Sequence, residues 1–338
     1  MKRTISCVMA SLMSGAVILS SALSCQRMPE TVREGGRVEV NVSIQGSNPS
    51  RVTNVTYSDE SKVNGLQIFV FNGQDREAYR AVTGAMQALV PATAGQRTVY
   101  ALVNAPDMSS VMTLAALNAA VTNLSDNAKD SFVMAGSVTQ ELTDGGNVVI
   151  TVKRIVARVS IAKISTNFVD YRANYKVRPE GIYLINVAAN TSFDVTADAT
   201  AWENRLAFVT GPCDALLRDA VSGVLVSNGS PYEKEHAFYA YPNKYPIVPD
   251  DYSEIWKPRG TLLVIEATLI TDLNEEIHGY YPIVLPHLDR NKTYVIEEVC
   301  ITRLPGDVPY KPIETGETQV TISVHEWETG LNLGTVTI

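Results

Sequence analysis

Alternating apolar and polar residues recur along most of this chain, and a period of two is typical of half-buried β-strands. The alternating segments are rich in Val, Ile, Thr and Tyr, and Gly, Pro, Asn or Asp bound them. We therefore expect a mostly β protein. The predicted strands are 38–44, 65–71, 98–103, 148–152, 157–164, 182–187, 262–270, 280–285, 294–302 and a C-terminal run that begins at 320.

Little helix is expected. Residues 108–124 place Val111, Leu114, Leu117 and Val121 roughly on one face, and polar residues from Asp107 onward offer caps. A shorter helix is predicted within 213–220. Neither segment is long enough to change the expected fold class.

A weak internal repeat suggests how the chain divides. RVEVNVSIQ followed by LQIFVFNGQ is similar to ARVSIAKIS followed by IYLINVAAN. Two tandem β-sandwiches with a junction near 153–158 would explain this repeat. The length of 338 residues and the 45% hydrophobic content suffice for two domains with cores.

The N-terminal 25 residues have the pattern of an export signal. Lys2 and Arg3 precede an apolar run over 5–23, and Ser24 and Cys25 follow it. This arrangement resembles a bacterial lipoprotein signal, in which Cys25 would carry the lipid, although Ala22 stands where an aliphatic residue is usual. Ordinary signal cleavage near Ser24 is the alternative. No later segment has 18 unbroken apolar residues, so no further membrane span is expected. Because of the signal, the mature protein is expected to be exported.

Charge and candidate chemistry exclude several functions. The net charge of −8 and the lack of basic runs argue against nucleic-acid binding. We find no glycine-rich phosphate loop, nucleophile elbow or Rossmann pattern, and therefore expect no catalytic residue, no cofactor and no enzyme. The four histidines share no zinc-binding motif, and no metal site is expected: His236, His278, His287 and His325.

Two smaller features stay open. The acidic segment 57–61 (YSDES) does not fit an EF-hand loop, so a solvated loop is favoured over a calcium site. Cys213 and Cys300 could pair as a disulfide in an oxidising compartment, or they are two buried thiols. Their spacing fits no disulfide framework or zinc pattern, so it does not decide between the two.

An ordered series of short motifs resembles the fimbrial subunits (fimbrillins, type V pilins) of Bacteroidales. These motifs are VEVNVSIQ, GSNPSR, VTNVTYSDESKVNGLQIFVFNGQ, KRIVARVSIAKIS and VTISVHEW, and together they span most of the chain. The resemblance implies two transthyretin-like Greek-key β-sandwich domains. It also implies a lipoprotein precursor, with palmitate among its lipids, that reaches the outer membrane and becomes part of a cell-surface fimbrium.

The same resemblance implies maturation by an arginine-specific protease at the Arg51–Val52 bond. The loop GSNPS is a plausible accessible site, with Arg33 and Arg37 as rival sites. The implied segments are a signal peptide at 1–24, a propeptide with the first strand at 25–51, an N-terminal domain at 52–154 and a C-terminal domain at 155–338.

Cutting after Arg51 would remove one strand and expose a groove that another strand must fill. The removed strand carries Val38, Val40, Val42 and Ile44. The C-terminal run alternates similarly, and a strand from the next subunit would enter the groove by β-strand addition, giving a head-to-tail polymer. Residues 320–327 either belong to the donor strand or complete the subunit's own second domain. In the second case the donor strand is 331–338, with the apolar residues Leu331, Leu333, Val336 and Ile338.

We therefore expect a fimbrial stalk subunit that mediates adhesion. Its expected partners are other copies of itself, anchor and tip subunits, the protease, and host proteins or glycans. The rival hypothesis is a monomeric surface lipoprotein, or a tip or anchor component, that binds glycan or host protein through the aromatic residues of 244–256.

Overall fold

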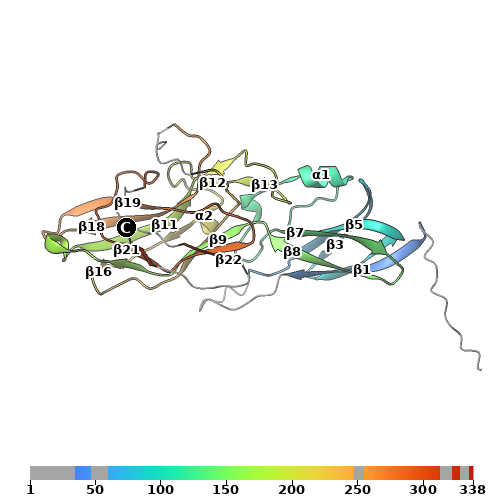
Figure 1. The fold of residues 1–338 in the computed structure, drawn as a ribbon, viewed down its shortest axis with the longest axis horizontal. Helices are drawn as coiled ribbons and strands as arrows, with labels where there is room; N and C mark the ends of the chain where they lie inside the picture. Colours follow the sequence, from blue (N-terminus) through green and yellow to red (C-terminus); the bar gives the residue numbers. More distant parts are fainter. Residues whose placement is uncertain (1–34, 47–59, 247–254, 313–321, 328–334, 338) are drawn as a thin grey trace, which may run out of the picture.

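The computed structural model describes residues 35–46, 60–246, 255–312, 322–327 and 335–337. Two β-sandwiches lie end to end along the long axis of the molecule (Figure 1). The expectation of a mostly β fold with little helix is confirmed. Within the described residues, no helix has the length and apolar character needed to cross a membrane.

The first sandwich is built from seven strands in the order β3-β2-β5-β7-β8-β1-β4. This path turns from one layer to the other between β7 and β8, where Met134 pairs with Arg154 and Ala135 with Lys153. The strands are β1 (Arg37–Gly46), β2 (Gly65–Asn72), β3 (Asp75–Thr83), β4 (Gln87–Thr93), β5 (Gly95–Val103), β7 (Met134–Leu142) and β8 (Asn147–Arg154).

The second sandwich has the same plan. One layer runs β15-β11-β18-β19, with β16 also on β11, and the other runs β17-β9-β20-β22. Their bounds are β9 (Ala157–Ile161), β11 (Lys176–Ile185), β15 (Arg218–Ala220), β16 (Val226–Ser227), β17 (His236–Ala240), β18 (Leu262–Ile270), β19 (Glu276–Val284), β20 (Lys292–Ile296) and β22 (Ser323–Glu326).

Short elements complete the fold and join its parts. A small sheet of β10, β21 and β23 flanks the second sandwich, and β12 pairs with β14. The antiparallel pair of β6 with β13 links the two sandwiches directly. These elements are β6 (Val121–Asn123), β10 (Ile164–Thr166), β12 (Val187–Ala188), β13 (Asn190–Ser192), β14 (Trp202–Glu203), β21 (Glu298–Ile301), β23 (Thr335–Thr337), α1 (Leu114–Ala119), α2 (Asp214–Leu217) and the 3₁₀ turns Leu124–Asp126 and Asp170–Arg172.

Strand pairing confirms the internal repeat. In the first sandwich, β1 lies between a parallel partner, β8, and an antiparallel partner, β4. In the second sandwich, β9 lies between parallel β20 and antiparallel β17. In the facing layers, β2 is flanked by β3 and β5, and β11 by β15 and β18, all antiparallel. The first strand of each half is thus a central strand of its sheet.

The expected helix over 108–124 is wrong in its length, since α1 covers only Leu114–Ala119. Its N-cap is Thr113, whose hydroxyl accepts a hydrogen bond from the Ala116 amide, and not a residue at 107–110. Asp107 instead caps its own turn by accepting bonds from Ser109. The helix ends at Ala119 because the backbone of residues 121–123 pairs with β13.

Three expected strands are interrupted. Residues 157–164 divide into β9 and β10, 182–187 into the end of β11 and β12, and 294–302 into β20 and β21. At Asn186 the backbone has a φ of 58°, in the left-handed region, so β11 cannot continue through it. The expected helix within 213–220 is confirmed in part, as α2 at Asp214–Leu217.

Candidate assembly site: the groove around β1

Strand β1 alternates between a buried and a polar face. Val38, Val40, Val42 and Ile44 point into the sandwich core, with exposed fractions of 7%, 0%, 0% and 5%. The side chains between them, from Glu39 to Gln45, are exposed or half-buried. This period of two is the pattern that predicted the strand.

The backbone of β1 is paired along both edges. Its register with β4 runs from Arg37↔Thr93 to Ser43↔Gln87, and its register with β8 runs from Asn41↔Asn147 to Gly46↔Val152. The flanking strands place apolar residues beside those of β1, because Val40 is opposite Val90. Ile44 is opposite Ile150. Both neighbours contribute fully buried side chains to the same core.

Polar contacts fix this register on the outer face. Asn41 Nδ2 donates to Asn147 Oδ1 at 3.3 Å, and the Glu39 amide donates to Asp144 Oδ1 at 3.1 Å. Gln45 Nε2 donates to the hydroxyl oxygen of Thr151 at 3.1 Å. These contacts are exposed, so water can replace them when the strand is absent.

Removing β1 would leave a groove with two unpaired edges. The facing edges of β4 and β8 would lose their hydrogen-bond partners, and the core would lose four apolar side chains. Burial of a Val or Ile side chain contributes roughly 1.5–3 kcal/mol, so the four together stabilise the sandwich by about 6–12 kcal/mol as an upper limit. A strand with the same alternation is the natural replacement.

The C-terminal segments pair within this chain. Strand β22 is antiparallel to β20 and extends the second sandwich, with Tyr294 opposite Val324. The half-buried Trp327 follows and packs against the core. Residues 322–327 therefore complete the subunit's own second sandwich, as one of the two sequence interpretations has it. Strand β23, which includes Val336, is parallel to β21 of the same chain.

Several predicted residues lie outside the described part of the chain. They are Cys25, Arg51, Val52, Leu331, Leu333 and Ile338, and nothing in the structure tests their predicted roles. The described residues thus include the strand that is predicted to be removed and the strands beside it, but not the predicted cleavage bond or most of the predicted donor residues.

Sequence reasoning missed a buried polar cluster at the junction of the sandwiches. Within the predicted solvated segment 57–61, Glu60 is instead buried, with 7% exposure. Its carboxylate accepts hydrogen bonds from Tyr239 Oη at 2.5 Å and from Trp327 Nε1 at 3.1 Å, and lies 3.6 Å from Arg158 Nη1. Arg154 stacks over the Trp327 ring at 4.8 Å. We call Glu60, Arg154, Arg158, Tyr239 and Trp327 the junction cluster.

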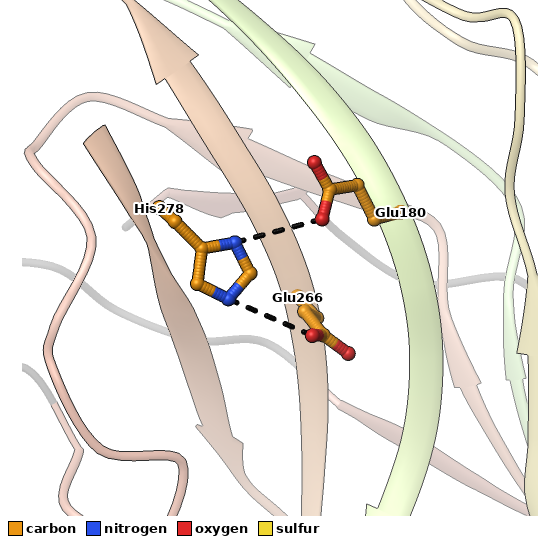
Figure 2. A group of neighbouring side chains, drawn as sticks. All are labelled: Glu180, Glu266 and His278. Carbon is orange, nitrogen blue, oxygen red and sulfur yellow. Dashed lines mark ion pairs between the residues drawn. The ribbon is translucent and has the colours of Figure 1, made fainter. Parts of the chain in front are cut away.

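A histidine and two carboxylates also meet on the outer face of the second sandwich (Figure 2). His278 on β19 lies between Glu180 of β11, 3.5 Å from Nδ1, and Glu266 of β18, 3.6 Å from Nε2. Each carboxylate already has an arginine neighbour, Arg178 at 3.7 Å and Arg218 at 4.0 Å respectively. The ring nitrogens point at different carboxylates, so we interpret the group as a cross-strand ion-pair network.

Cys213 and Cys300 are both free thiols. Cys213 is buried, Cys300 is half-buried, and no disulfide joins them. Burial, with a smaller contribution from nearby Glu203, raises the pKa of the Cys213 thiol to about 12, so little thiolate forms at neutral pH.

Aromatic residues of 244–256 contribute to a small cavity in the second sandwich. Tyr245 and Trp256 both pack edge-on against Trp202, with ring centroids 5.4 and 5.6 Å apart. Trp202 and Tyr245 line a cavity of about 220 Å³ together with polar residues that include Asn190, Thr196 and Asp198. Asn190 already bonds the backbone and hydroxyl of Thr200, so its polar atoms serve the local turn.

The fold places this chain in the class of proteins built from two β-sandwiches in tandem, each with a central first strand. Residues 37–177 match the family model described as major fimbrial subunit protein (FimA). A major fimbrium subunit FimA type-2 of Porphyromonas gingivalis is 28% identical over 192 residues, which are 50% of this chain and 49% of that protein. A FimA type-3 subunit is 27% identical over the same length. The chain spans about half the length of the curated relatives it matches.

Solved structures share the fold over nearly the whole chain. A putative cell adhesion protein of Bacteroides eggerthii has a TM-score of 0.63 at 17% identity, covering 91% of this chain and 100% of that one. A fimbrilin of P. gingivalis has a TM-score of 0.59 at 16% identity, covering 90% and 97%. The predicted resemblance to Bacteroidales fimbrial subunits is confirmed. The matched family is one of structural subunits and not of enzymes.

Proposed function

We propose that this chain is a stalk subunit of a surface fimbrium that polymerises by protease-triggered donor-strand exchange. The observation that carries the proposal is the place of β1. It is a ten-residue central strand with one buried apolar face, followed by a segment that contains the Arg51–Val52 bond.

In this proposal the precursor is a lipoprotein anchored at Cys25, and the cut after Arg51 removes both the anchor and β1. The sandwiches correspond to the domains 52–154 and 155–338. Residues Leu331, Leu333, Val336 and Ile338 of one subunit fill the groove of the next, head to tail. Anchor and tip subunits end the polymer, and host proteins or glycans are its adhesion targets.

The test compares chains that end at 330 and at 338, each cut after Arg51. We expect similar melting temperatures, because the deleted residues include only the three-residue β23 among the described elements. Polymers should form only from the longer chain, because the shorter one has nothing to place in the next groove. A shorter chain that still polymerises would contradict the proposal, as would filaments whose N-terminus is Val38 or earlier.

The monomeric alternative has one observation in its favour, the cavity beside Trp202. Half-buried aromatic rings with polar neighbours suit a sugar ring. If both chains stay monomeric after the cut and the protein binds an immobilised glycan array, this alternative replaces the fimbrial proposal.

A further inference from the structure

The buried carboxylate of Glu60 connects two segments of the chain: the one that follows the predicted cleavage bond and the one that precedes the predicted donor residues. Glu60 follows the predicted scissile bond at Arg51 by nine residues, and Trp327 precedes the predicted donor residue Leu331 by four. The Glu60 Oε2 atom accepts the Trp327 indole N–H at 3.1 Å. Two segments 267 residues apart in sequence thus meet in one hydrogen bond.

The acceptor of this bond is buried. Glu60 has 7% exposure, and a buried donor or acceptor that loses its partner is costly to leave unsatisfied. Arg158 Nη1 lies 3.6 Å from the same oxygen and supplies the opposite charge. Tyr239 donates to the other carboxylate oxygen at 2.5 Å, so Glu60 cannot turn away without losing that bond too.

The Trp327 ring is held on its remaining sides by groups from both sandwiches. Arg154 lies over the ring at 4.8 Å, Phe132 meets it edge-on at 5.8 Å, and Tyr239 stacks at 5.8 Å. Its backbone amide donates to Asn291 at 3.0 Å. Trp327 is therefore a fixed point at the junction, and the chain continues from it.

The fixed point matters because the predicted donor residues follow it in sequence. Leu331 comes four residues after Trp327, and β23 at Thr335–Thr337 pairs with β21 of the same chain. The position of Trp327 therefore sets where the chain leaves the junction toward that segment.

We propose that Glu60 is a positioning residue for strand donation, which holds Trp327 at the junction and sets the point from which residues 328–338 reach the next subunit. This inference rests on the proposed function. Donation exchanges the β23–β21 pairing within one chain for pairing in a neighbour, while Trp327 stays in place. A fixed base lowers the ordering cost of each added strand.

Glu60→Gln tests this, and Glu235→Gln is the matched control. Glu235 lies 3.1 Å from Arg158 Nη2 in the same network but has no described bond to Trp327. We expect E60Q to move the indole ¹H–¹⁵N resonance of Trp327, assigned with Trp327→Phe, and to slow polymer growth after cleavage at least fivefold. E235Q should do neither. W327F removes the indole donor outright, whereas E60Q keeps one amide oxygen as an acceptor. W327F should therefore slow growth at least as much as E60Q, and it serves if E60Q does not fold.

A synthetic peptide of residues 328–338 separates this inference from the proposed function. Added to the cut full-length protein, it should block growth at the same concentration in parent and E60Q, since the groove is unchanged. If the peptide binds neither protein, the proposed function is wrong, and so is this inference, which rests on it. If the peptide blocks both equally but E60Q and W327F grow at the parent rate, Glu60 is not a positioning residue and donor-strand exchange still stands.

Discussion

The first strands of the two sandwiches occupy equivalent places but are buried differently. In β1 buried and exposed side chains alternate, whereas all five residues of β9 are buried. The outer face of β9 carries Arg158 and Ser160, which are both buried, whereas the outer face of β1 is exposed or half-buried. A strand that interacts through one face and two edges can be exchanged for another of the same pattern. A strand enclosed on all sides cannot.

The largest expected difference is between the outer faces of β9 and β1, and it is measured as the loss in the free energy of unfolding. Arg158→Ala would leave the buried carboxylate of Glu60 and the half-buried one of Glu235 without their shared cation, and should lower the free energy of unfolding by about 3–5 kcal/mol. Asn41→Ala on the outer face of β1 loses one exposed hydrogen bond and should change it by less than about 0.5 kcal/mol. Urea unfolding of both variants measures this difference, and equal losses would contradict it.

A smaller effect distinguishes the buried faces before and after maturation. Val42 and Val159 are both fully buried, so replacing either by Ala should cost roughly 1–3 kcal/mol in the precursor. If cleavage removes β1 as proposed, Val42→Ala should have no effect on filament stability. Val159→Ala should destabilise both forms. Thermal melting of precursor and filament provides the measurement, and a V42A filament that melts early would show that β1 is retained.

The smallest expected effect is a pH dependence confined to the second sandwich. Burial raises the pKa of the Glu235 carboxyl above its usual value, although Arg158 partly offsets this. A carboxyl with a higher pKa in the folded chain stabilises the fold fully below its unfolded pKa, and this contribution is lost as the pH rises through the folded pKa. The parent should therefore lose stability relative to E235Q as the pH rises above about 4.3. Parallel pH profiles of the two proteins would refute this.

The strands that the sequence predicts are those whose pattern resembles that of β1 or is apolar throughout. Strands β3, β4, β7 and β17 were among those missed, and for β3 and β4 the reason is physical. The edge strand β4 contains Pro91, which an edge tolerates because one of its sides needs no donor. In β3, the sequence DREAYRAVT is mostly half-buried or exposed, so its charged residues obscure the alternation.

The groove was predictable and the junction cluster was not. Alternation in 38–44 identifies the buried face of β1 from local sequence alone. Glu60 depends on Tyr239 and Trp327, which are 179 and 267 residues away, and no local pattern signals a buried carboxylate whose partners are so distant. The same holds for His278, whose carboxylate neighbours come from two other strands.

The direction of β1 has a mechanical consequence. The strand runs along the length of the molecule, as Figure 1 shows. Its hydrogen bonds to β4 lie across that direction, as in any antiparallel pair. A pull along the axis on a strand in this place stretches all of these hydrogen bonds together in shear, instead of breaking them one after another from an end. In the proposed polymer, each contact between subunits would therefore resist tension with the combined strength of all the hydrogen bonds of its donated strand.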